Sequence, residues 1–120
     1  MLRIIEGLFG SFCEVRYVAV YADGELTFRQ REQIAGSSSS DTDRFEELLV
    51  NPALLTLARQ RGNIDCGGLR FVIVAYGNFY QLIREISGGH ISICLDKGVD
   101  LTSTPPRIME HLEMEYPGLF

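Results

Sequence analysis

The sequence predicts an α+β fold in which one five-stranded antiparallel sheet carries helices, in the chain order α-β-β-α-β-β-β-α. Three apolar runs, LRFVIVAY, FYQLIREI and HISICL, lie between residues 69 and 95, separated only by Gly77-Asn78 and by Ser87-Gly88-Gly89. Short apolar runs joined by glycine turns are typical of an antiparallel meander. An earlier pair of runs flanks Asp23-Gly24, a strong signal for a two-residue hairpin turn. None of these runs has the pattern of a catalytic centre.

The first part of the chain predicts a short helix followed by this hairpin. Apolar residues recur at roughly helical spacing over residues 2–12, although two glycines there weaken the helix by about 1 kcal/mol each relative to alanine. From Glu14 the alternation becomes that of a strand, with apolar residues on both faces, which indicates a position inside the sheet. Residues 26–31, after the turn, predict a strand whose arginines protect an edge.

The middle of the chain predicts a polar loop and then an interrupted helix. Residues 35–40 (AGSSSS) are small and polar, so we expect a loop within the domain. Asp41 or Thr42 can cap the next helix, and Asn51-Pro52 supplies a second cap with proline at the first helical position. The helix is therefore expected to be kinked or broken, and Gly62-Asn63 is expected to end it.

The last part of the chain predicts the meander and a closing helix. Residues 69–76 are expected to form its first strand. Thr104 followed by Pro105-Pro106 is typical of a helix start, and the apolar residues of residues 108–112 can face the sheet. Residues 116–120 are expected to be irregular.

Length and composition are those of one globular domain spanning residues 1–120. A net charge of -5 argues against a surface that follows nucleic-acid phosphates, so no nucleic-acid partner is expected. The apolar runs are too short to cross a bilayer, and Glu6 interrupts the first of them, so we expect neither membrane insertion nor a signal peptide. The three cysteines, an odd set without CxxC spacing, favour reduced thiols in the cytoplasm.

The element order, the hairpin VRYVAVYADGELTF, and the run from LRFVIVAYGNFYQLIREI through GGHISICLDKG into a helix resemble the Roadblock family. This is the dynein light chain roadblock type with its bacterial members, and the resemblance covers nearly the whole chain. It implies a profilin-like domain without catalytic activity or cofactor, which forms homodimers or heterodimers. It also implies a scaffold or regulator of Ras-like small GTPases. Some relatives join motor or signalling complexes.

The sheet edges point independently to self-association. The strand at residues 69–76 would lie at one edge and is apolar on both faces, apart from Arg70. An unpaired edge of this kind is an association site, and pairing about a two-fold axis would join two sheets into one. We therefore expect an isologous dimer whose interface includes Leu69, Phe71, Ile73, Leu54 and Leu57. The alternative is that the strand residues are only core and that a loop covers the edge.

Side chains that could carry metal or catalytic chemistry do not form a recognisable motif. His90, Cys94, His111 and Cys66 are of zinc-ligand type, but their spacing matches no familiar metal site. We expect His90 to lie at a solvent-facing strand end and Cys94 to be a buried small hydrophobe. A nucleophilic cysteine would need a histidine in hydrogen-bond contact and an orienting group, a geometry that sequence alone does not establish. No metal site and no enzymatic activity are expected.

Other suggestive patterns have simpler explanations. Gly67-Gly68 and Gly88-Gly89 are expected to form turns, because neither GxGxxG nor GxxxxGK[ST] occurs. Residues 96–100 (DKGVD) lack the remaining ligands of a calcium loop and are expected to be solvated. Arginines at 29, 31 and 44 could form a basic surface, but arginines on an edge strand also guard against aggregation, and we favour that role.

A different class of function, a small-molecule-sensing domain of profilin-like or PAS-like type, stays open. A curved antiparallel sheet under helices can enclose a ligand pocket. Phe79, Tyr80, Tyr17 and Tyr21 could line it, although aromatic residues at strand spacing are also ordinary core. A cavity in the folded chain would distinguish the two classes.

Overall fold

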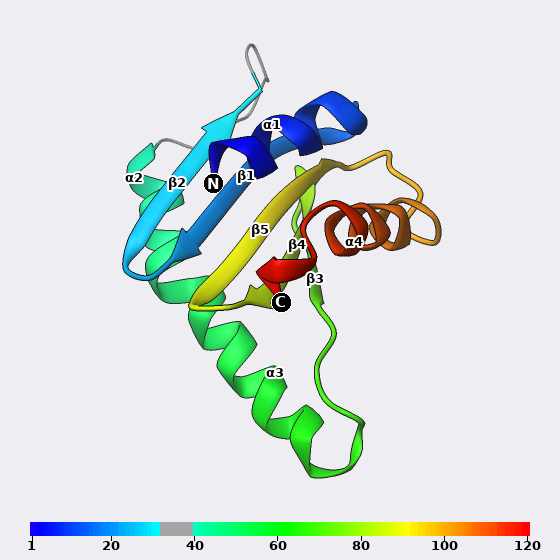
Figure 1. The fold of residues 1–120 in the computed structure, drawn as a ribbon. Helices are drawn as coiled ribbons and strands as arrows, with labels where there is room; N and C mark the ends of the chain where they lie inside the picture. Colours follow the sequence, from blue (N-terminus) through cyan, green and yellow to red (C-terminus); the bar gives the residue numbers. More distant parts are fainter. Residues whose placement is uncertain (32–39) are drawn as a thin grey trace.

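A computed structural model describes residues 1–31 and 40–120. Its five strands form one antiparallel sheet in the order β2-β1-β5-β4-β3, with helices on both faces (Figure 1). The element order confirms the sequence prediction, with the central helix divided in three. The strands are β1 Val15–Ala22, β2 Glu25–Gln30, β3 Val72–Ala75, β4 Phe79–Ile86 and β5 Gly89–Asp96; the helices are α1 Leu2–Ser11, α2 Ser40–Phe45, the π-helix η1 Glu46–Val50, α3 Asn51–Asp65, α4 Thr104–Glu115 and the 3₁₀ helix η2 Pro117–Leu119.

The sheet separates two layers because its central strands bury both faces. On one face, alternate residues such as Val18, Ile93 and Leu82 pack with apolar residues of α1 and α4 in the main core. Ile108, Met109 and Leu112 of α4 are buried there, as predicted. On the other face, Tyr17 and its neighbours lie under the central helical segment formed by α2, η1 and α3. The three central strands β1, β5 and β4 thus connect two differently composed cores.

Two of the three glycine-containing hairpin turns have glycines with positive φ. Asp23 and Gly24 have φ values of 53° and 84°, as the two central positions of a type I′ turn require. Gly88, with a φ of 80°, opens the turn into β5. Gly89 is required for another reason, since a Cβ there would collide with the backbone carbonyl of Tyr21 on β1. This close approach joins the ends of β1 and β5.

The central helix differs from the prediction in how it is interrupted. Residues 46–50 form a π-helical turn, and Asn51 lies within helical backbone instead of capping a new helix. The helix begins at Ser40, so Asp41 and Thr42 lie in its first turn. It also continues past the predicted end at Gly62-Asn63, as far as Asp65. Gly62 has no Cβ, so the backbone at Gly68 can lie close to it. The predicted loop at 35–40 falls almost entirely outside the described residues.

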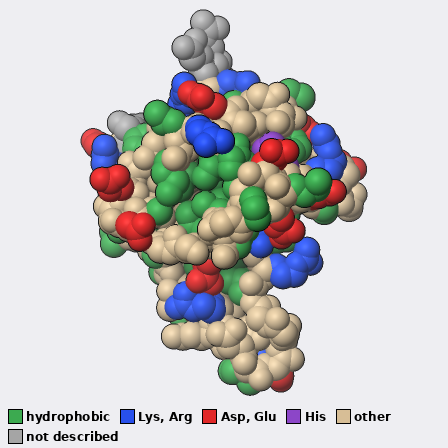
Figure 2. Space-filling view, viewed as in Figure 1, with side chains coloured by type: hydrophobic (Ala, Val, Ile, Leu, Met, Phe, Trp, Pro, Cys, Tyr) green, Lys and Arg blue, Asp and Glu red, His purple; other side chains and the backbone are tan. Residues whose placement is uncertain are grey.

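Two elements near the C-terminal half are also shorter or more regular than expected. The strand predicted at residues 69–76 is confined to Val72–Ala75. The final segment, predicted to be irregular, contains the 3₁₀ turn η2. Among the described residues, no helix is both long and apolar enough to cross a membrane. On the face that carries α1 and α4, hydrophobic side chains gather near the middle and charged side chains of both signs surround them (Figure 2).

Candidate functional site: an interaction face

Large apolar side chains remain exposed along the outer side of the central helical segment. Phe45, Leu49, Leu57 and Ile64 are 58%, 61%, 66% and 75% exposed. Leu57 and Ile64 are seven residues apart on α3, an interval that keeps side chains on one side of a helix, while Phe45 directly precedes the π-helix η1 and Leu49 lies within it. We call these four residues the helix stripe. Exposed large apolar side chains on neighbouring turns of a helix make this segment a candidate interaction surface.

The neighbouring sheet edge has backbone groups available for pairing. β3 pairs with β4, and it is the last strand of the described sheet on that side. The Tyr76 amide donates to the Phe79 carbonyl (2.9 Å), and backbone groups in antiparallel strands alternate between the two neighbours. The amides and carbonyls of Ile73 and Ala75 therefore face outward. Ile73 is also 37% exposed.

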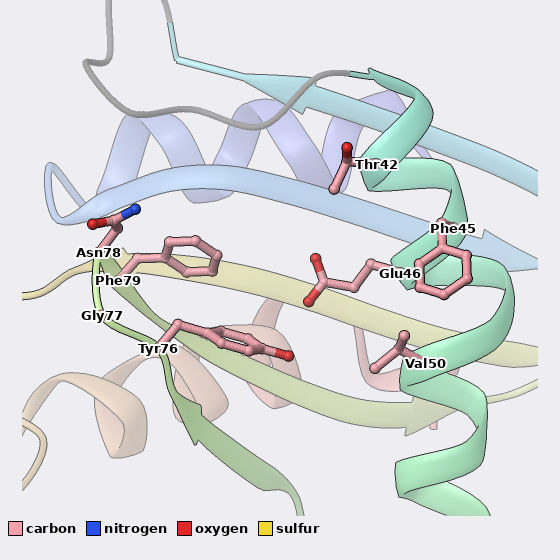
Figure 3. A pocket seen from close by; sticks show the side chains of 8 residues that line it. All are labelled: Thr42, Phe45, Glu46, Val50, Tyr76, Gly77, Asn78 and Phe79. Atoms are coloured by element: carbon pink, nitrogen blue, oxygen red, sulfur yellow. The ribbon is translucent and has the colours of Figure 1, made fainter.

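A cavity of about 420 Å³ lies where the helical segment meets the β3–β4 turn. In Figure 3 the Glu46 side chain extends from η1 toward the rings of Tyr76 and Phe79, while Phe45 and Val50 form the helical wall. Thr42, Gly77 and Asn78 complete the lining. The cavity thus combines aromatic and aliphatic walls with a carboxylate. We call it the Glu46 pocket.

The Glu46 carboxylate is partly withdrawn from water and lies among other acids. Burial raises its pKa, and the nearby charges of Glu47 and Asp43 raise it further, against the hydrogen bond that the Tyr76 hydroxyl donates. The pKa of Asp43 is raised by burial and by Glu47. The pKa values of both carboxyl groups are thus raised, the direction expected when burial, and to a smaller extent neighbouring negative charge, disfavour the ionised form. This region would bind a cation more readily than an anion.

Beneath the pocket, a buried carboxylate fastens the helix to the sheet. Glu47 is fully buried in η1, and the Tyr17 hydroxyl donates to its Oε2 at 2.9 Å. Asn51 Nδ2 donates to Oε1 at 2.8 Å, and His90 Nε2 lies 2.9 Å from the same oxygen. Burial and the Glu47 charge raise the pKa of Tyr17, which keeps that hydroxyl a donor. We call these four residues the Glu47 network.

Adjacent glutamates of the π-helical turn take different roles, because neighbouring side chains on a helix point in different directions. A π-turn inserts extra backbone into a helix, and such turns recur at functional sites. Here Glu46 reaches the pocket near the edge strand, while Glu47 enters the interior. Neither glutamate was singled out by the sequence patterns. The available signal was an acidic pair, Glu46-Glu47, directly beside the apolar Leu48-Leu49 in the predicted helix.

The structure brings most of the predicted interface residues to this side of the molecule. Leu57 belongs to the helix stripe, and Leu54 is half-buried beside it. Ile73 lies on the free edge, as predicted. Leu69 and Phe71 precede β3, and Phe71 is half-buried against the main core. Whether a second chain covers these five residues stays a prediction.

The predicted positions of the chemically reactive residues are only partly correct. Cys94 is buried, as predicted, and burial raises the pKa of its thiol. The prediction for His90 was wrong, since it is 2% exposed and bound into the Glu47 network. Across residues 1–31 and 40–120, no three histidine, cysteine or acidic side chains are grouped to hold a metal ion. His111 packs against Phe12 and Tyr116.

The edge arginines have different roles from one another. Arg31 was expected to guard the edge, but its guanidinium instead donates to the carbonyls of Val15, Phe9 and Phe12. It thereby joins the end of β2 to the segment that connects α1 with β1. Arg29 is exposed on β2, as a guarding residue should be.

The aromatic residues expected to line a ligand pocket separate to different places. Phe79 lines the Glu46 pocket, whereas Tyr80 packs against the main core. Tyr17 lies beneath the central helix, and Tyr21 lines a second, smaller depression beside His90. The pocket is therefore built by a different aromatic set, in which Tyr76 and Phe45 accompany Phe79.

No known family model and no curated protein matches this chain by sequence. Among solved structures, the gliding protein MglB from Thermus thermophilus is similar, with a TM-score of 0.64 and 16% sequence identity. The match covers 94% of this chain and 87% of that chain. At this identity the likeness shows a shared fold, which agrees with the predicted fold class.

Proposed function

We propose that this chain is a noncatalytic, cytoplasmic protein-interaction module of the Roadblock type, which forms a dimer and serves a Ras-like small GTPase as scaffold or regulator. The dimer is supported by two observations together: the helix stripe is exposed, and α3 packs against β3, the last strand of the described sheet on that side. One surface offers backbone hydrogen bonds and the adjacent surface offers apolar area. A two-fold axis through the edge would let each copy supply both.

The dimer is tested first by light scattering over a concentration series. The expected particle has twice the 13.5 kDa mass of one chain. Leu57→Glu should raise the dimer dissociation constant on the order of tenfold or more, because a charge would enter an apolar seam. Leu57 is 66% exposed in the single chain, so the fold should be retained. A chain that stays monomeric at every concentration would contradict the proposal.

A matched control uses an equally exposed leucine on the other face. Leu2 on α1 is 56% exposed, and Leu2→Glu introduces the same charge far from the proposed seam. Its dissociation constant should equal that of the unmodified chain. Equal weakening by both substitutions would mean that net charge, and not the helix stripe, controls association.

The GTPase partner rests on the resemblance to the Roadblock family, and the fold shared with gliding protein MglB supports it at the level of architecture. Purified Ras-like GTPases from the source organism, loaded with GDP or with a GTP analogue, should bind with different affinities in calorimetry. Equal and negligible binding in both nucleotide states would remove this part of the proposal. A related Roadblock protein is then the partner to test.

A small-molecule-sensing role is a second candidate, and the Glu46 pocket is the observation that favours it. Its volume of about 420 Å³ lies within the range of ligand sites. A thermal-shift screen of small organic cations and metabolites should then find a compound that raises the melting temperature, with the effect lost in Glu46→Gln. A screen without any shift would leave the interaction module as the function.

A further inference from the structure

We infer that the Glu46 pocket is a receptor for a guanidinium group supplied by a second copy of the chain, namely that of Arg70. This inference rests on the proposed dimer and names the contact that fixes its register. Arg70 is exposed just before β3, and Glu46 lies beside the other end of the same edge. Two-fold symmetry brings opposite ends of an edge strand together.

The alternation of the strand limits how two copies of β3 can pair. Directly opposed residues of antiparallel strands project to the same face of the sheet. A two-fold axis normal to the sheet places the same face of both copies on the same side of the joined sheet. Ile73 and Val74 project to opposite faces, so they cannot oppose each other. The two-fold axis must pass beside one residue, not between two neighbours. Registers centred on Ile73 or on Val74 use the middle of β3.

Both registers deliver Arg70 to the same pocket. Centring on Ile73 places Arg70 opposite Tyr76 of the second copy, and centring on Val74 places it opposite Asn78. Tyr76 and Asn78 both line the Glu46 pocket. Opposed residues in a sheet have Cβ atoms about 5 Å apart, so a flexible arginine reaches the pocket in either case. Pairing would extend β3 back to Arg70. The Arg70 side chain would then lie on the same face of the sheet as those of Val72 and Val74, the face that carries the central helix and Tyr76.

The chemistry of the pocket matches this occupant. A guanidinium binds a carboxylate and stacks on aromatic rings, and Glu46 lies among Tyr76, Phe79 and Phe45 (Figure 3). Asp43 and Glu47 add negative charge nearby, and burial and these charges raise the pKa of Glu46. In the single chain, the Arg70 guanidinium lies over its own Phe71 ring, 5.3 Å from the centroid. Among the described residues no carboxylate forms an ion pair with it.

The inference is tested with two charge-reversed variants, measured alone and mixed. In an Arg70→Glu dimer, an acidic side chain at position 70 of one copy would meet Glu46 of the other. In a Glu46→Arg dimer, two cationic side chains would meet there. Each substitution should therefore raise the dimer dissociation constant about tenfold to a hundredfold. Mixing them should restore association as a heterodimer, since both pockets then pair opposite charges. Sedimentation of differently labelled chains reports this directly. Arg3→Glu, an exposed arginine on α1, is the matched control and should not respond to mixing.

The outcomes separate the contact from the dimer itself. An unmodified dimer with unaltered association in both variants would overturn the Arg70–Glu46 contact and leave the dimer standing. Weakened variants that fail to recover on mixing would also overturn it. A monomeric unmodified chain would overturn both. If Glu46→Arg fails to fold, Arg70→Gln and Glu46→Gln decide through a double-mutant cycle, in which additive losses contradict the contact.

Discussion

Replacement of Glu47 by alanine should be among the most damaging single changes in this chain. The Glu47 side chain is fully buried between η1 and the sheet. Its two oxygens engage Tyr17, Asn51 and His90 at 2.8–2.9 Å. Alanine would remove the shared acceptor and leave the polar atoms of these three side chains without it. The helix would then lose its principal polar attachment to β1 and β5.

The magnitude follows from the number of groups affected. Each buried polar group left unsatisfied costs about 1–3 kcal/mol. Removal of the buried carboxylate also relieves its own desolvation, which offsets part of that cost, and broken buried pairs typically lose about 3–5 kcal/mol in net terms. We therefore expect the free energy of unfolding to fall by about 3–5 kcal/mol. That is a large share of the roughly 5–15 kcal/mol that stabilises a typical domain.

Urea denaturation followed by circular dichroism measures this loss. Glu47→Gln preserves the shape and one acceptor oxygen, so it should lose only about 1–2 kcal/mol. Glu110→Ala, on the exposed side of α4, should stay within about 0.5 kcal/mol of the unmodified chain. All variants need the same protein concentration, because self-association adds to apparent stability. A loss below about 1 kcal/mol for Glu47→Ala would refute the reasoning that this network holds the helix.

Three further predictions, two of them with a control substitution, test the fold and its electrostatics. Gly89→Ala should lower the free energy of unfolding by about 1–3 kcal/mol or more, because the added carbon collides with β1. The control Gly10→Ala on α1 has open space around it and should raise the free energy of unfolding by up to about 1 kcal/mol, and thermal unfolding measures both. Arg31→Met should cost about 2 kcal/mol in urea denaturation because three carbonyls lose their shared donor, while Arg29→Met should cost less than about 0.5 kcal/mol. Asp43→Asn should stabilise the chain at pH 7, because burial and a neighbouring acid raise the folded-state pKa of Asp43 and the folded chain therefore loses stability as the pH rises through that pKa. Urea denaturation midpoints at pH 7 and at about pH 4 measure the difference, which should be smaller at the lower pH.

Each of these expectations has a contradicting result. A Gly89→Ala variant as stable as the original chain would mean that β1 and β5 can separate slightly at that turn. Equal losses for the two arginine variants would assign the effect of Arg31 to general surface charge. An Asp43→Asn variant that is stabilised equally at both pH values would remove ionisation as the cause, because the raised pKa makes the folded-state carboxyl more protonated at about pH 4 than at pH 7.

The order of elements was predictable because it depends on local patterns. The alternation in β1, the Asp23-Gly24 turn and the proline-marked start of α4 each depend on a few adjacent residues. The extent of β3 was not predictable in the same way. Residues 69–71 have strand-like apolar character but are not part of β3, since the strand is defined by its partner β4 as much as by its own side chains.

The interaction face shows the same division. An exposed edge strand could be anticipated from the apolar run around Ile73, and a helical contribution from Leu57. The Glu46 pocket could not, because it joins η1 to a turn that is distant in the sequence. Spacing along the chain contains no information about which distant segment η1 meets.

The sequence by itself determined the fold class, the order of strands and helices, the main hairpin turns and the apolar faces of the terminal helix, since these depend on residue propensities and short-range periodicity. Only the tertiary structure decided that His90 is buried, that Glu47 bonds to three partners, and that a carboxylate lies among aromatic rings beside a free strand edge. The physical reason is that the energy of a buried charge depends on which distant groups surround it, and those neighbours exist only once the chain has folded.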